Sequence, residues 1–154
     1  MRRTGVTLRG ISWNVQGMAP RALRGFVGRI GEEVEWDYLL LQECGKFNHM
    51  TQVDGHRVIC SASRLGERCR AIVVHARLAA TVKDETIKDE PRILRVDLGF
   101  ENLNCRLVSC HMSAKHDKMA YLEDLERLEK AIITTGDHRA HPVIVSIDAQ
   151  DCVG

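Results

Sequence analysis

Short apolar runs of strand length alternate along this chain with two segments of helical periodicity, which favours a layered α/β or α+β domain. The runs at residues 37–42 and 142–147 are mostly apolar without alternation, as is typical of buried strands. Residues 93–98 alternate apolar and polar side chains, which predicts a half-buried strand. Further strands are expected at residues 7–15, 57–61, 70–75 and 104–110, the middle two as neighbours in a meander.

Two helices are predicted between these strands. Pro20 suits the first turn of a helix over residues 20–34. Each of the three glycines in this segment lowers the stability of such a helix by up to ~1 kcal/mol. A second helix is predicted over residues 117–135, with Gly136 placed to end it. Its apolar side is expected to consist of Met119, Leu122, Leu125, Ile132 and Ile133.

Composition excludes several classes of protein. A chain of 154 residues with 44% hydrophobic and 28% charged residues has the make-up of one globular domain, not of a disordered chain or a coiled coil. No apolar run approaches the ~20 residues that span a bilayer, and the basic start lacks the apolar segment of a secretory signal. The six cysteines form no CxxC pair. Because no secretory signal is expected, we expect reduced thiols in an intracellular protein, either nuclear or cytoplasmic, with a disulfide framework as the lesser alternative.

The net charge of +1 conceals a local bias. Residues 1–31 contain six arginines and no acidic residue. This segment either presents a basic face to phosphates or forms a helix with a solvated basic side.

Four strand-like runs end in polar residues that are capable of chemistry, namely Asn14, Glu43, His111 and Asp148. Because ligands of open α/β sheets bind beyond the carboxyl ends of the strands, these ends could form one site. The carboxylates and amides, including Gln150, suit Mg²⁺ or Mn²⁺, and a histidine can move a proton near neutral pH. Such a set suits phosphoester hydrolysis, although each of these residues taken alone is more often a loop, turn, helix-cap or sheet-rim residue.

These residues stand within motifs that resemble the endonuclease/exonuclease/phosphatase superfamily. Residues 12–17 (SWNVQG) resemble its opening WN motif, residues 41–43 (LQE) its metal motif, and residues 69–74 (CRAIVV) the strand that follows. Residues 108–114 (VSCHMSA) resemble the strand that ends in a catalytic histidine, and residues 143–150 (VIVSIDAQ) the strand that leads to GDFN. The order and spacing fit across nearly the whole chain.

The resemblance implies a DNase I-like four-layer α/β/β/α sandwich and a role for each matched residue. Glu43 would bind a divalent metal, Mg²⁺ or Mn²⁺, with Asn14 and Asp148 as further ligands. Asn14 would also position the scissile phosphate, and Asp148 would orient or deprotonate the attacking water. His111 would act as a general acid or phosphate ligand, and Gln150, in place of the usual asparagine, would hold the phosphate.

The chain departs from the family pattern in two places. The GDFN motif is Ile147-Asp148-Ala149-Gln150 here, and the chain ends at Gly154. The family's second half, with its closing Asp-His pair, would then be missing. Residues 1–154 are therefore expected to form a single partial, C-terminally truncated domain whose exposed sheet face favours self-association.

The function expected from these features is divalent-metal-dependent phosphodiester hydrolysis by an endonuclease acting on nucleic acid, DNA before RNA, in the manner of mobile-element endonucleases. One alternative is a catalytically inactive remnant or a domain that depends on a partner chain. Another is a phosphatase or phosphodiesterase of small phosphorylated substrates or phospholipids.

Overall fold

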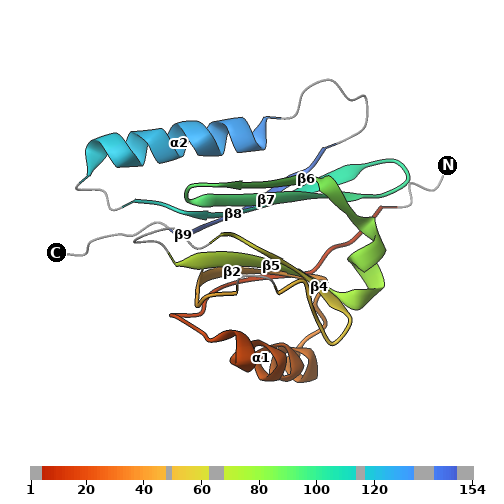
Figure 1. The fold of residues 1–154 in the computed structure, drawn as a ribbon. Coiled ribbons are helices and arrows are strands. Elements are labelled where there is room, and N and C mark those ends of the chain that lie inside the picture. Colours follow the sequence, from red (N-terminus) through yellow and green to blue (C-terminus); the bar gives the residue numbers. More distant parts are fainter. Residues whose placement is uncertain (1–4, 48–49, 63–67, 114–116, 134–140, 149–154) are drawn as a thin grey trace.

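The computed structural model describes residues 5–47, 50–62, 68–113, 117–133 and 141–148. Two β-sheets are stacked face to face, and one α-helix covers the outer face of each sheet (Figure 1). This is the four-layer α/β/β/α arrangement that the family resemblance implied, and it confirms the layered α/β or α+β class predicted from the pattern of strands and helices. No helix within the described ranges is long and apolar enough to cross a membrane.

The first sheet has the strand order β1-β2-β5-β4-β3. Its strands β1 and β2 are parallel and are joined through helix α1, whereas β4 and β5 are antiparallel neighbours, as predicted. These elements are β1 (Gly10–Asn14), α1 (Pro20–Glu33), β2 (Tyr38–Cys44), β3 (Gln52–Val53), β4 (His56–Cys60) and β5 (Cys69–Val74).

The second sheet has the order β6-β7-β8-β9, in which β8 and β9 are parallel and joined through helix α2. A short 3-10 helix, η1, leads from the first sheet into the second. These elements are η1 (Ala76–Thr81), β6 (Val82–Glu90), β7 (Ile93–Gly99), β8 (Asn104–His111), α2 (Lys118–Ile132) and β9 (Val143–Asp148).

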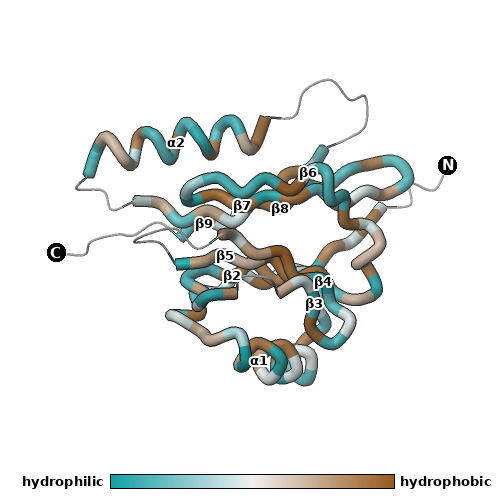
Figure 2. Tube along the Cα trace, viewed as in Figure 1, coloured by the Kyte–Doolittle hydropathy of each residue, from teal (hydrophilic) through white to brown (hydrophobic). Residues whose placement is uncertain are grey.

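Three apolar clusters hold the four layers together. Leu23, Val27 and Ile30 of α1 pack on the outer face of the first sheet. A second cluster fills the space between the sheets, where apolar segments of both face each other (Figure 2). Leu128 and Ala131 of α2 join the third cluster, on the outer face of the second sheet. Successive side chains of a strand such as β2 therefore pack into different clusters, one between the sheets and one beneath a helix.

Strands β3 and β6 were not predicted. The nine residues of β6, VKDETIKDE, are mostly charged, and β6 lies at the edge of its sheet. A charged edge strand lacks the apolar pattern that marks a strand in sequence, because only part of its surface is buried.

Three expectations about burial were wrong. The run at residues 142–147 was expected to be a buried strand, but in β9 only Ser146 is buried, because in the described part of the chain β9 has a neighbouring strand on one side only. Strand β7 is buried along both faces, because one face packs between the sheets and the other lies beneath α2. Helix α2 turns Asp124, Leu128 and Ala131 inward, so the predicted apolar side is exposed at every position, Met119 by 76%. The carboxylate of Asp124 accepts a hydrogen bond from the backbone N–H of Ser113 at 2.7 Å, which fixes this helix face against the sheet.

Asp37 anchors the beginning of β2. Its buried carboxylate accepts hydrogen bonds of 2.6 Å from the Arg77 guanidinium and from the backbone N–H of Arg9. Burial by itself would raise the pKa of Asp37, but these bonds and the two nearby guanidinium groups outweigh it and lower the pKa. The ionised carboxylate therefore stabilises the fold.

Asp37→Asn is expected to lower the free energy of unfolding by about 2 kcal/mol, because two charge-assisted bonds are weakened. Since the folded pKa lies below the unfolded value of about 3.9, this stabilisation is present above that value. It is lost as the pH falls through the folded pKa. Urea unfolding at pH 7 and below pH 4 measures both effects. The control Asp84→Asn replaces an exposed carboxylate that pairs with half-buried Arg57, and it should stay within about 0.5 kcal/mol of wild type. Equal losses in both variants would contradict the anchoring role.

Candidate active site

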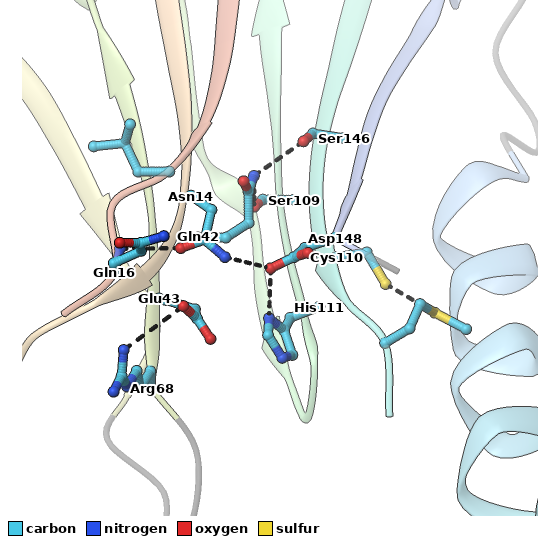
Figure 3. A network of polar contacts seen from close by, with 12 residues as sticks. Asn14, Gln16, Gln42, Glu43, Arg68, Ser109, Cys110, His111, Ser146 and Asp148 are labelled. Atoms are coloured by element: carbon cyan, nitrogen blue, oxygen red, sulfur yellow. Dashed lines mark hydrogen bonds and ion pairs between the residues drawn. The ribbon is translucent and has the colours of Figure 1, made fainter. Parts of the chain in front are cut away.

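The predicted site residues that the structure describes meet at the end of the two stacked sheets where strands β1, β2, β8 and β9 finish. Glu43 comes from the first sheet, and His111 and Asp148 come from the second. One ligand atom from each of these three side chains lies within 4.8 Å of the other two (Figure 3). The structure therefore brings together three of the five predicted site residues as a compact cluster of potential metal ligands.

A break in the β2 ladder aims Glu43 into this cluster. The register between β2 and β5 shifts between Leu41 and Cys44, and Glu43 has a φ of +54°. A residue other than glycine in this left-handed region costs on the order of 1–3 kcal/mol, and bulges of this kind often re-aim a side chain beside an active site. The carbonyl of Glu43 accepts a 2.6 Å hydrogen bond from the N–H of Gly17, whose own φ is +83°. The loop after β1 thus holds the strained residue in place.

His111 and Asp148 are direct partners in the parallel pairing of β8 with β9. His111 Nδ1 lies 3.3 Å from Asp148 Oδ2. Burial lowers the pKa of His111; the carboxylate of Asp148 raises it, but Arg92 adds to the lowering. The imidazole is therefore largely neutral near pH 7. The geometry favours a proton on Nδ1 that faces Asp148, which leaves the lone pair on Nε2.

Asn14, at the end of β1, connects the first sheet to Asp148 at the end of β9 in the second sheet. Its Nδ2 donates a 2.8 Å hydrogen bond to Asp148 Oδ2, and its Oδ1 accepts one of 3.0 Å from the backbone N–H of Gln16. The second bond is the side-chain turn that asparagine commonly forms. Asn14 is thus a partner of Asp148, and its roles as metal ligand and phosphate contact remain predictions. Gln150 lies outside the described residues.

The two carboxylates of the cluster are oxygen donors of the kind that a hard divalent cation prefers, and the imidazole of His111 lies beside them. A cationic group already lies beside the cluster, since an Nη1 atom of Arg68 is 3.6 Å from Glu43 Oε2. Arg68 is exposed and was not predicted as a site residue, because an isolated arginine before a strand carries no distinguishing pattern. Its guanidinium places a positive charge next to Glu43.

A polar layer directly beneath the site was also missed. Gln42 precedes Glu43, and Ser12, Ser109 and Ser146 each stand two residues before Asn14, His111 and Asp148, respectively. Because residues two apart share one face of a strand, this spacing was a usable signal. We call these four residues the inter-sheet polar layer; Gln42, Ser109 and Ser146 are buried, and Ser12 lies at its exposed margin.

Comparison with solved structures places the architecture in a known class. The chain has the DNase I-like fold of the endonuclease/exonuclease/phosphatase superfamily. No protein-family model matches the sequence, and no curated protein matches it either. The predicted resemblance in fold is therefore confirmed by structure, at sequence identities below 20%.

Three solved structures illustrate the similarity. A humanized D. rerio TDP2 carrying 14 mutations has a TM-score of 0.63 at 18% identity, over 92% of this chain and 61% of that chain. The endonuclease domain of TRAS1, a telomere-specific non-LTR retrotransposon, has a TM-score of 0.56 at 19% identity, over 92% and 58%. An endonuclease/exonuclease/phosphatase family protein from Leptotrichia buccalis C-1013-b has a TM-score of 0.56 at 12% identity, over 90% and 66%. This chain thus spans about three-fifths of the length of the solved chains it matches.

Proposed function

We propose that this chain carries the metal-binding part of a divalent-metal-dependent phosphodiester hydrolase that acts on nucleic acid, with DNA preferred over RNA. The observation that carries the proposal is the cluster of Glu43, His111 and Asp148 at the edge of the stacked sheets. The named activity of the TRAS1 domain, an endonuclease of a retrotransposon, supports the choice of nucleic acid.

In the proposed mechanism Glu43 and Asp148 would hold Mg²⁺ or Mn²⁺, with His111 beside them. A bound cation would stabilise the negative charge that develops on the oxygens of the scissile phosphate. Asp148, held in place by Asn14 and His111, orients the attacking water and accepts its proton. With Nδ1 of His111 engaged by Asp148, its Nε2 acts on the substrate as a phosphate ligand or, once protonated, as a general acid. Gln150 is proposed to contact the phosphate.

The test is nicking of supercoiled plasmid by the purified chain with Mg²⁺, with Mn²⁺, and with EDTA. We expect nicking with either metal and none with EDTA, since hydrolysis depends on the cation. The variant Glu43→Ala/Asp148→Ala, purified identically, controls for contaminating nucleases. Activity that persists in EDTA or in this variant would contradict the proposal. Labelled DNA, RNA and inositol phosphates, assayed side by side, test the substrate; faster turnover of inositol phosphates would favour a small-molecule phosphatase.

A second candidate is a domain that is inactive alone and requires further strands, from its own chain or from a partner. In the described part of the chain, β1 and β9 each pair with one strand only. On these edges Trp13 is 53% and Ile147 48% exposed. Size-exclusion chromatography of the same sample separates the candidates. An inactive oligomer supports this alternative, and an active monomer that melts cooperatively contradicts it.

A further inference from the structure

The inter-sheet polar layer lies where the two halves of the candidate site must be held together. Nε2 of Gln42, on the first sheet, donates to Ser146 Oγ on the second sheet at 2.9 Å. It also lies 3.1 Å from the carbonyl of Leu40 and 3.4 Å from the hydroxyl oxygens of Ser12 and Ser109. One amide therefore contacts residues of both sheets, deeper between the sheets than the site and above it in the view of Figure 3.

The site itself depends on the spacing of the sheets. Glu43 belongs to one sheet, and His111 and Asp148 belong to the other, so a shift between the sheets would separate the ligands. At the level of the site, the bond from Asn14 to Asp148 crosses the gap. One level deeper, the bond from Gln42 to Ser146 crosses it again.

The two bonds that cross between the sheets, Asn14 to Asp148 and Gln42 to Ser146, run between the same two regions of the sheets. Asn14 and Gln42 are direct partners on β1 and β2, and Ser146 and Asp148 share one face of β9. The backbone carbonyl of Gln42 also accepts a 3.0 Å bond from the N–H of Val15. Gln42 is thus fixed at its backbone and at its side chain, immediately before the strained Glu43.

We infer that Gln42 is a positioning residue, which holds the two sheets at the spacing that brings Glu43 to His111 and Asp148. This inference rests on the proposed function. Gln42 is 3% exposed and bonds to serine and backbone groups, so it acts on the metal ligands without touching the substrate. Partners one step removed from a metal commonly change its affinity by about 10–100-fold.

The test compares wild type with Gln42→Met, which retains the length of the side chain and removes its hydrogen bonds. Titration with Mn²⁺, followed by the EPR signal of the free ion, is expected to show an affinity about 10–100-fold weaker. In the nicking assay kcat should fall by a similar factor, whereas KM for the plasmid should change less than about 3-fold, because phosphate contacts dominate DNA affinity. Gln52→Met, the same substitution at the exposed position of β3, is the control and should leave both quantities unchanged.

Ser146→Ala provides a second variant: it removes the closest acceptor of the Gln42 amide and, with it, the hydroxyl that bonds to Ser12 Oγ. It should weaken Mn²⁺ affinity in the same direction, and in the double variant the two effects should be less than additive. Wild-type Mn²⁺ affinity in folded Gln42→Met would overturn the inference and leave the proposed function intact. If Gln42→Met does not fold, wild-type affinity in Ser146→Ala overturns it. A wild-type chain that neither binds Mn²⁺ nor nicks DNA would refute the proposed function instead.

Discussion

Replacing Glu43 by Gln is expected to lower kcat for plasmid nicking by about 10³-fold and to weaken Mn²⁺ binding at least 10-fold. The cluster contains only two carboxylates, and loss of one halves its negative charge. A metal ion contributes several kcal/mol to a transition state of this kind, and about 4 kcal/mol corresponds to 10³-fold in rate. The amide has the size of the carboxylate, so the bulge at Glu43 can be retained. The partner Arg68 is exposed and stays solvated, so the melting temperature should change little.

The matched control for this prediction is Glu123→Gln on helix α2, an exposed residue in an ion pair with Arg127. It should behave as wild type in both assays. EPR titration and initial nicking rates are measured on the same preparations. Wild-type Mn²⁺ affinity and EDTA-sensitive nicking in Glu43→Gln would show that the metal binds elsewhere in the protein.

The second large effect is expected for Asp148→Asn, with a fall in kcat of about 10²–10⁴-fold that persists at saturating Mn²⁺. The asparagine can still accept a bond from Asn14, so the connection between the sheets survives. It cannot accept a proton from water, and a neutral amide no longer favours the same proton position on His111. Loss of a proton-transfer group typically costs this range of rate.

Single-turnover cleavage at increasing Mn²⁺ concentration distinguishes the two roles of Asp148. If excess Mn²⁺ restores the wild-type rate, Asp148 is a metal ligand alone and its role toward water is wrong. The control Asp117→Asn replaces the residue that caps α2, whose side chain accepts from the N–H of Ala120 at 3.1 Å. Because asparagine caps helices as well as aspartate does, this variant should nick DNA at the wild-type rate.

Much of the architecture could be predicted from local pattern. The first helix was expected over residues 20–34 and is observed at Pro20–Glu33, because apolar spacing and a proline in the first turn are local signals. The strands ending at Asn14, His111 and Asp148 were likewise expected from local apolar runs and are observed as β1, β8 and β9. Charged β6 and the inward face of α2 could not be predicted, because each depends on which surface a neighbouring element covers.

By itself, the sequence determined the order of the two helices and of every described strand except β3 and β6, and it placed a chemically capable side chain at the end of four strands. Periodicity and turn chemistry act between residues close in the chain, and such signals can be read without the fold. Only the tertiary structure decided that Asn14 bonds to Asp148, that Gln42 reaches Ser146, and that a bulge aims Glu43 at His111. The two bonds join residues 134 and 104 positions apart, so their geometry depends on how two whole sheets stack.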